Sequence, residues 1–404
     1  MPFRIALSGL NAASADLEVT ANNLANVNTV GFKESRAEFE AVYSSSTQTT
    51  SSAAIGSGVR LDDVSQQFAQ GNVDFTNNAL DIAIGGEGFF VLSGDGAVTY
   101  TRAGNFRIDN EGYLVSPDTS RLQGYLPTTP GEFNGGQLSD LQITTGANPP
   151  AATTRTDFDV NVPAGAAQPS VTPFDPATPA SYNHSTSITT YDSLGNPHTS
   201  TVYFVKEAAA NAWTAHVTID GNTVGAGQAI TFDATGNLST PAGGAFTLPA
   251  YDPANGASPI NLNVDVAGTT QFGGSFAVNA ISQDGSATGT LTGLEIDSDG
   301  ILIARYTNGQ STALGKIAMS IFSNPQGLQQ IDGAWAATVA SGEPILGEAN
   351  VGRFGNLTSG ALEASNVDLT EQLVNMITAQ RNFQANAQMI STADSTTQTI
   401  INIR

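Results

Sequence analysis

Two turn-like segments have the residue types of ligand-binding loops. Gly85, Gly86 and Gly88 have the spacing of part of a phosphate loop. Neither a basic residue nor a predicted helix follows them, and such a loop uses both to hold a phosphate. The run Asp297–Gly300 begins like a calcium loop, yet no glutamate follows before Gly309 to supply the bidentate ligand. We therefore interpret both as turns between strands, and we predict no cofactor and no metal site.

The remaining residues whose side chains could take part in catalysis form no catalytic pattern. His184, His198 and His216 are scattered through one β-rich stretch, and we interpret them as ordinary surface residues. Adjacent carboxylates such as Asp62 and Asp63 are common in so acidic a chain and carry no information about acid–base catalysis. The absence of cysteine excludes disulfides, thiolate catalysis and zinc–thiolate sites. We predict no catalytic residues and no enzyme activity.

Composition excludes further classes of function. The chain of 404 residues has a net charge of −22 and only three lysines. Binding to nucleic acid requires lysine and arginine to replace counterions on phosphates, so that class is discarded, and anionic lipid surfaces are disfavoured for the same reason. No segment approaches the eighteen apolar residues of a membrane span, which predicts no membrane insertion. Charged residues are only 12% of the chain, about half the usual ~25%. This suits a chain that buries much of its exterior against other subunits.

Heptad patterns at both ends of the chain predict two helices, each with one face suited to packing against another helix. Near the start, one residue recurs every seven positions and a second follows three later: Phe3, Leu10, Leu17 and Leu24, with Ala6, Ala13, Thr20 and Val27. Near the end the same spacing recurs: Leu373, Gln380, Ala387, Asp394 and Ile401, with Met376, Phe383, Ile390 and Thr397. Such spacing places residues on one face of a helix and keeps that face against a partner helix. We predict that the two helices pack against each other or against neighbouring subunits.

Asparagines crowd the end of the first predicted helix, at Asn22, Asn23 and Asn26. Asparagine favours helix ends, because its side chain bonds to nearby backbone groups and it tolerates left-handed geometry. Bonds from these side chains to neighbouring subunits are the alternative, and the sequence leaves both open. The predicted assembly interface therefore comprises Phe3, Leu10, Leu17, Leu24, Asn22, Asn23, Asn26, Leu373, Met376, Phe383 and Ile390.

The region between the helices is predicted to be mainly β, in nested sandwich-like or barrel-like domains. Short alternating segments are separated by Asp-x-x-Gly turns, as in such domains. Proline-rich stretches mark where an outer β domain, 146–284, is inserted into a β domain formed by 71–145 and 285–353. Connecting arms follow at 29–70 and 354–365, and the paired helical domain is 1–28 with 366–404. Residues 44–58, nearly all Ser, Thr, Ala and Gly, are predicted to be an extended flexible segment.

Three stretches resemble the bacterial flagellar rod and hook proteins. The first is 6–13 with 22–33, the second is 80–106, and the third is 360–384. The segment 189–206 further resembles the outer domain of hook-type members, and the chain is longer than a distal rod protein requires. The resemblance thus covers nearly the whole chain and favours the hook type.

The resemblance implies a structural subunit of the flagellar hook. Such subunits form a curved, flexible tube that acts as a universal joint between rod and filament. It implies self-association into a helical homopolymer. It also implies as partners the distal rod protein, the hook cap protein, the hook–filament junction protein and the flagellar export apparatus. The implied location is extracellular, in the hook and basal body, reached by type III export without a cleaved signal peptide. The alternatives are a distal rod protein and, in a different class, a secreted β-rich adhesin or surface-layer protein.

Overall fold

The computed structural model describes residues 2–42, 56–94, 96–129, 131–143 and 146–402. It contains two compact units. The first comprises Met1–Thr145, Gly293–Ala304 and Thr312–Arg404, and the second comprises Gly146–Thr292 and Arg305–Ser311. The predicted fold class, mainly β with a helix at each end, is confirmed. Within the described residues, no helix is both long and apolar enough to cross a membrane.

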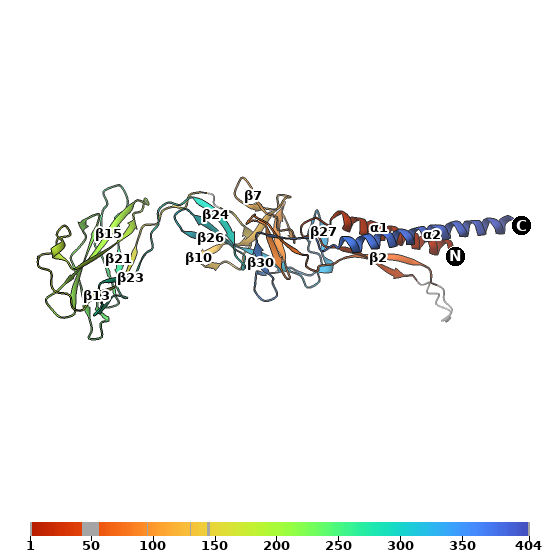
Figure 1. Cartoon of the computed structure of the whole chain (residues 1–404). Coiled ribbons are helices and arrows are strands. Elements are labelled where there is room, and N and C mark those ends of the chain that lie inside the picture. The colour runs from red at the N-terminus through yellow and green to blue at the C-terminus, as the bar shows by residue number, and fades with distance from the viewer. Residues whose placement is uncertain (1, 43–55, 95, 130, 144–145, 403–404) are drawn as a thin grey trace. The chain divides into compact units, whose positions relative to one another are not determined.

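The two terminal helices lie side by side in the first unit (Figure 1). Helix α1 spans Pro2–Ala25 and helix α2 spans Leu369–Asn402. Two contacts fix their register. Asn23 bonds to Gln372, and Gly9 lies against Asn386. Because residue number rises along α1 as it falls along α2 between these contacts, the helices are antiparallel. At 1.5 Å per residue they are about 36 Å and about 51 Å long.

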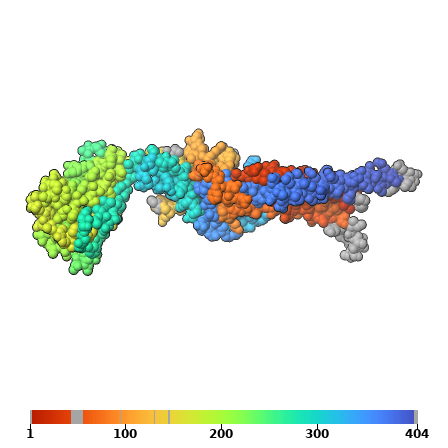
Figure 2. Space-filling model, viewed as in Figure 1, coloured from red at the N-terminus to blue at the C-terminus, as the bar shows by residue number. Residues whose placement is uncertain are grey.

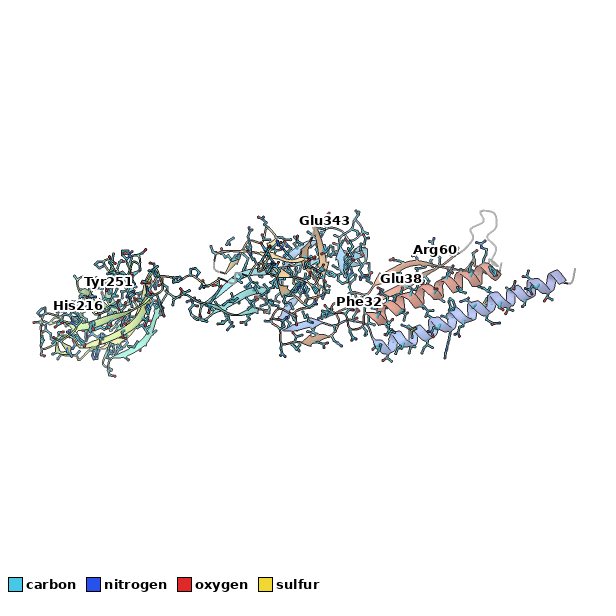
Figure 3. All side chains as sticks on the ribbon, turned by 90° about the horizontal axis from the view of Figure 1, so that it is seen from above. Phe32, Glu38, Arg60, His216, Tyr251 and Glu343 are labelled. Atoms are coloured by element: carbon cyan, nitrogen blue, oxygen red, sulfur yellow. The ribbon has the colours of Figure 1, made fainter. Side chains whose placement is uncertain are left out.

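A β-hairpin packs beside α1, where the sequence predicted only a connecting arm. Strand β1, Ser35–Ala41, pairs antiparallel with β2, Val59–Gln66. Glu38 and Arg60, labelled in Figure 3, mark its two strands alongside the helix. The predicted flexible segment 44–58 lies outside the described residues except for 56–58.

Strands from early and late in the chain pair to form the β part of the first unit. Strand β3 (Val73–Phe75) pairs with β31 (Ala361–Glu363), and β4 (Ile82–Gly85) pairs with β30 (Asn356–Ser359). The main sheet has the order β24 (Leu291–Ile296), β25 (Ile301–Tyr306), β26 (Ser311–Ile321), β9 (Arg121–Tyr125), β5 (Phe89–Gly94), β6 (Ala97–Thr101), β28 (Ala334–Ala336), β27 (Gln329–Ile331). Shorter strands attach to it: β7 (Arg107–Ile108), β8 (Leu114–Val115), β12 (Ser139–Asp140) and β29 (Ile345–Glu348); β10 (Pro127–Thr129) and β11 (Glu132–Phe133) form a separate pair.

The second unit contains two sheets around one apolar core. One has the strands β20 (Ala245–Thr247), β21 (Asn263–Asp265), β13 (Arg155–Pro163), β22 (Thr270–Phe272) and β23 (Ala277–Gln283). The other has β14 (His184–Tyr191), β15 (Pro197–Lys206), β16 (Ala212–Ile219), β17 (Asn222–Thr223), β18 (Gln228–Phe232) and β19 (Leu238–Thr240). Side chains of β13 and β15 alternate between buried and more exposed, because successive strand residues point to opposite faces. The buried faces meet around Trp213, Phe204 and Phe158.

The interpretation of the histidines as surface residues is wrong for His198, whereas His184 and His216 are half-buried. His198 is buried, with Nδ1 2.6 Å from Asp220 Oδ2 and Nε2 3.4 Å from Asp192 Oδ2. His184 stacks on Phe276, and His216 stacks on Phe174. The carboxylate partners are 6 and 22 residues away, and the aromatic partners are further away still. Local sequence patterns therefore carry no signal of them.

Candidate assembly interface

The seam between the terminal helices is formed by small and polar residues. On α1 the buried residues Ala6, Ala13 and Thr20 are spaced by seven, as the heptad pattern requires. On α2 the fully buried positions are Gln372 and Ala379, again seven apart. Small side chains let the two backbones approach closely. An ideal Cβ on Gly9 would lie only 2.6 Å from Asn386 Oδ1, so a larger residue there would have to displace the Asn386 side chain.

The predicted interface residues are divided between this seam and the outer surface. Leu10, Leu17 and Leu24 are half-buried on α1, and Met376, Phe383 and Ile390 are half-buried on α2. Phe3 and Leu373 are exposed, by 51% and 40%. On α2 the heptad positions that begin at Met376 are therefore partly buried. In the other half of the heptad pattern Leu373 and Gln380 are exposed, whereas Gln372 and Ala379, each one position earlier, are buried.

The asparagine cluster makes its bonds within the subunit. Asn23 is buried; its Nδ2 donates to the carbonyl of Ser35 at 2.7 Å, and its Oδ1 accepts from the Ser35 N–H at 2.9 Å. Asn26 Nδ2 donates to the Asn22 carbonyl and side chain, both at 3.0 Å. Asn23 therefore fastens α1 to the start of the hairpin and to α2, whereas Asn22 is exposed.

A buried ionic cluster consists of Lys33, Glu363 and Arg102. It joins the segment between α1 and β1, which carries Lys33, to the end of β31 and to the residue that follows β6. Glu363 Oε1 is 2.5 Å from Lys33 Nζ and Oε2 is 3.1 Å from Arg102 Nη1, with all three side chains at most 5% exposed. Oε1 also accepts from the Gly71 N–H at 2.9 Å. Burial lowers the pKa of Lys33 and of Arg102, and contact with Glu363 opposes this shift. The sequence analysis missed this cluster. Its only signals were one of three lysines in an acidic chain and the presence of all three residues in stretches that resemble the family.

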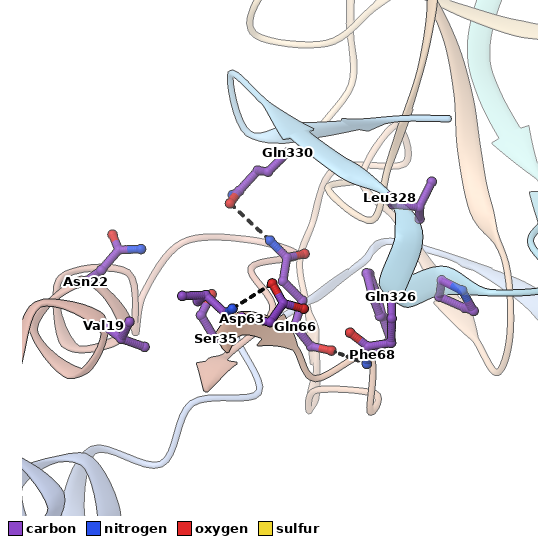
Figure 4. A pocket seen from close by; sticks show the side chains of 11 residues that line it. Val19, Asn22, Ser35, Asp63, Gln66, Phe68, Gln326, Leu328 and Gln330 are labelled. Carbon is purple, nitrogen blue, oxygen red and sulfur yellow. Dashed lines mark hydrogen bonds between the residues drawn. The ribbon is translucent and has the colours of Figure 1, made fainter. Parts of the chain in front are cut away.

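A cleft of about 320 Å³ opens between α1, the hairpin and the loop 325–330 (Figure 4). Asn22 and Val19 of α1 lie on one side, and Gln326 and Gln330 on the other. Gln66 at the end of β2 ties the hairpin to the second side, because its Nε2 donates to Gln330 Oε1 at 3.0 Å and its carbonyl accepts from Gln326 at 2.7 Å. Four of the lining side chains are amides and a single one, that of Asp63, is titratable, so these lining residues form no cluster of titratable groups suited to catalysis.

The outer faces of the helices and hairpin carry large apolar side chains exposed by about half. On α2 these are Leu369, Leu373, Val374, Ile377 and Met389; on α1, Phe3 and Leu7; on the hairpin, Phe39, Val42, Leu61 and Val64. Contiguous exposed apolar side chains mark contact sites with other molecules. Faces of this kind are typical of a structural subunit that associates with other protein chains. Among the described residues, no group of His, Cys, Asp or Glu could hold a metal ion.

Comparisons with known proteins identify the family. Descriptions of flagellar domains match four regions: "Flagella basal body rod protein" at 3–33, "Flagellar hook protein FlgE/F/G D1 domain" at 83–173, "Flagellar basal body protein FlaE D2 domain" at 159–286 and "Flagellar basal body rod FlgEFG protein C-terminal" at 358–403. The chain is 37% identical to the flagellar hook proteins FlgE of Escherichia coli and of Salmonella typhimurium, over the full length of both partners. It is 32% identical to that of Borreliella burgdorferi, over 98% of each chain. The chain belongs to the flagellar hook protein family and is a structural subunit of the bacterial flagellar hook.

A solved structure has the same fold. The flagellar hook protein FlgE2 of Helicobacter pylori matches with a TM-score of 0.54 at 16% identity, over 72% of this chain and all of that one. The predictions of the family and of the hook type are confirmed by the 37% identity to hook proteins over the full chain.

Proposed function

We propose that the subunit polymerises through its terminal helices into a curved, bendable tube that transmits torque from rod to filament. The observation that carries this proposal is the exposure of Phe3, Leu7, Leu373, Val374 and Ile377 on the helix pair. At ~25 cal/mol per Å² of apolar surface, covering such side chains in every subunit supplies a large part of the free energy of assembly.

Bending follows from the surfaces away from the helices. Glycine-rich and hydroxyl-rich surfaces with few charges form contacts that are individually weak, since exposed ion pairs contribute only about 0–1 kcal/mol. Such contacts can slide as the tube bends, while the tightly packed helices keep the lattice. In this proposal the helices line the tube, and the unit that contains residues 146–292 lies outermost. The proposed assembly residues remain Phe3, Leu10, Leu17, Leu24, Asn22, Asn26, Leu373, Met376, Phe383 and Ile390. Asn23 acts within the subunit to hold α1 in place.

The proposal extends to the ends of the tube. The distal rod protein would contact the first subunits, the hook cap protein the growing end, and the hook–filament junction protein the finished end. The flagellar export apparatus would deliver the chain without cleavage of its N-terminus. We propose no catalytic role.

The test is replacement of the hook gene in a non-motile bacterium that lacks its own hook protein. Expression of this chain should restore swimming and give curved hooks by electron microscopy. Intact N-terminal sequence of the hook protein sheared from these cells would support uncleaved export. Straight, rod-like tubes would favour a distal rod role, and an absence of any tube from correctly folded, exported protein would contradict the proposal.

A further inference from the structure

A buried histidine of the second unit lies where three loops meet. This unit is coloured yellow to blue-green in the space-filling view (Figure 2). His198, near the start of β15, is 9% exposed. Its Nδ1 lies 2.6 Å from Asp220 Oδ2, in the turn after β16, and its Nε2 lies 3.4 Å from Asp192 Oδ2, in the turn between β14 and β15. Asn255 of a third loop donates from Nδ2 to Asp192 Oδ2 at 2.6 Å.

This arrangement of acceptors suits a protonated histidine. Both ring nitrogens face carboxylate oxygens, which only accept hydrogen bonds. The imidazolium form donates from both nitrogens, whereas the neutral ring donates from one and turns a lone pair toward the other carboxylate. Burial lowers the pKa of His198, but the bonds to Asp220 and Asp192 outweigh burial and raise it. Within the described residues, these two carboxylates are the charged groups that bond to the ring, and the third loop contributes the neutral Asn255.

The bond to Asp192 is the one that deprotonation breaks. The contact with Asp220 is shorter, 2.6 Å against 3.4 Å, so a neutral ring keeps its single proton on that side. Its unprotonated Nε2 then faces Asp192, whose side chain is 0% exposed and cannot be screened by water. Burial raises the pKa of Asp192, but hydrogen bonds from Asn196, Asn255 and His198 outweigh burial and hold it well below 3.8. The carboxylate therefore stays charged and repels the neutral ring.

Asp192 also organises the turn 192–196. Its Oδ1 accepts from the backbone N–H groups of Leu194 and Asn196, both at 2.8 Å. The turn that begins at Asp233 is built in the same way, with two backbone N–H groups bonded to Oδ1. Among the described residues, no histidine bonds to the Asp233 carboxylate. The two turns thus differ in whether a histidine shares the carboxylate.

Two segments of the same unit, which we call the entry ribbon, are 148–153 and 286–289. They lie close to the two ends of the stretch Gly146–Thr292 and pair antiparallel, for example at Ala151 and Ser286. Neither segment contains a titratable side chain. Any change of the ribbon with pH must therefore come from a neighbouring group.

The turn 192–196 lies against both segments of the entry ribbon. An ideal Cβ on Gly195 would lie 2.8 Å from Pro150 Cβ and 3.3 Å from the Thr288 backbone N. Beside the turn, the Thr153 N–H donates to the Tyr191 carbonyl at 2.9 Å, and the Tyr191 N–H donates to Thr153 Oγ1 at 2.8 Å. A change in the turn is thus transmitted directly to the ribbon.

We propose that His198 is a pH-dependent latch, which holds the turn 192–196 against the entry ribbon when the ring is protonated and releases it when the ring is neutral. The latch is closed below about pH 6.5, the ordinary pKa of histidine, and opens as pH rises through the raised pKa. The ribbon is therefore held more firmly in acidic than in alkaline surroundings. This property belongs to the single subunit and does not depend on polymerisation.

The first experiment measures amide hydrogen exchange by mass spectrometry on the dilute, purified full chain, from about pH 5.5 to about pH 8.5. After correction for the intrinsic pH dependence of exchange, peptides that cover 191–196 should lose about tenfold in protection as pH rises, because one charge-assisted hydrogen bond is lost. Peptides that cover the turn of Asp233 are the control within the same molecule, and their corrected protection should not change.

Two variants separate the charge of the latch from its packing. His198→Gln has no charge to lose, so the turn 192–196 should show low protection at every pH and no step. Asp192→Asn keeps a side-chain oxygen for the two N–H groups of the turn but removes the charge that repels the neutral ring, so protection should persist at high pH. If His198→Gln does not fold, Asp192→Asn alone still tests the latch. His216→Gln is the matched control, because His216 stacks on Phe174, and it should retain the step.

The second experiment follows the entry ribbon itself and uses the absence of cysteine. A spin label on Thr288→Cys, an exposed position of the ribbon, should gain mobility over the same pH range. In the background of His198→Gln the label should be mobile at every pH. A label on Ala234→Cys, exposed in the turn of Asp233, should show no change with pH.

The outcomes decide each step of the inference. Constant protection of 191–196 across the pH range, or a step that survives in His198→Gln, would overturn the latch. An equal step in the turn of Asp233 would show a general effect of pH and would also overturn it. Loss of protection in the turn without a change of the label at Thr288→Cys would show that the turn does not hold the ribbon.

Discussion

Removing the carboxylate of Glu363 should be among the most damaging single changes in the first unit. Glu363→Ala leaves Lys33 and Arg102 buried without their shared anion, and it leaves the Gly71 N–H without its acceptor. Removing one partner of a buried ion pair costs about 3–5 kcal/mol, because the remaining charge is desolvated and uncompensated. Deprotonation of Lys33 relieves part of this, since burial already lowers its pKa. We expect a loss of about 4 kcal/mol, a large share of the ~5–15 kcal/mol that stabilises a typical domain.

The two tryptophans allow the effect to be assigned to one unit. Trp335 lies in the first unit and Trp213 in the second, and both are buried. In a Trp213→Phe background, urea unfolding followed by fluorescence reports the first unit, and in a Trp335→Phe background it reports the second. Glu363→Ala should lower the midpoint of the first transition and leave the second unchanged.

A matched control tests the role of burial. Glu87→Ala removes a carboxylate that pairs with Arg353 at a similar distance but is 62% exposed, and we expect less than about 0.5 kcal/mol. Equal effects of Glu363→Ala and Glu87→Ala would refute the reasoning, as would a loss in the transition reported by Trp213.

Three further predictions concern the backbone, pH and the helix seam. Gly31 has φ +68°, and an ideal Cβ would lie 2.5 Å from the Ala103 backbone N. Gly31→Ala should therefore lower the free energy of unfolding reported by Trp335 by about 1–3 kcal/mol or more. An unchanged free energy would show that the contact relaxes freely. Burial lowers the pKa of His198, but hydrogen bonds to Asp220 and Asp192 outweigh this and raise it above 6.5. The second unit should therefore lose stability as pH rises from about 6.5 through the raised pKa. When unfolding is followed by Trp213 fluorescence, His198→Gln should abolish this loss of stability. A loss of stability that persists in this variant would have to come from another titrating group. Leu17→Asp and Phe383→Asp should each abolish sedimentation of polymer while the β parts melt as in wild type, because a carboxylate at the seam costs several kcal/mol per subunit. The control is Gln384→Asp, which lies on the exposed side of α2. Normal polymerisation of Phe383→Asp would place that residue outside the contact.

The terminal helices and β segments could be predicted because their burial repeats along the chain. Ala6, Ala13 and Thr20 recur with the helical period, and β13 alternates with the period of a strand. On α2 the pattern located the helix but not its buried face. Gln372 and Ala379 are the buried residues, and neither is a strong apolar signal.

The features that escaped prediction depend on residues far apart in sequence. Lys33 and Glu363 are separated by 330 residues, and no local period relates them. The hairpin β1–β2 escaped for a different reason. Its burial comes from α1 on one side only, so Phe39 and Leu61 remain exposed and its strands show no clear alternation. Side chains such as Phe3 and Leu373 are exposed in the subunit, and their role follows only from what other copies cover.

The central claim is that the terminal helices form the wall of a tube, and the most direct test is an electron cryomicroscopy reconstruction of polymer grown from the full chain. The account predicts a curved tube in which α1 and α2 line the lumen and the unit that contains residues 146–292 lies outermost. A tube whose lumen is lined by that β unit, with the helices at the outer surface, would contradict it.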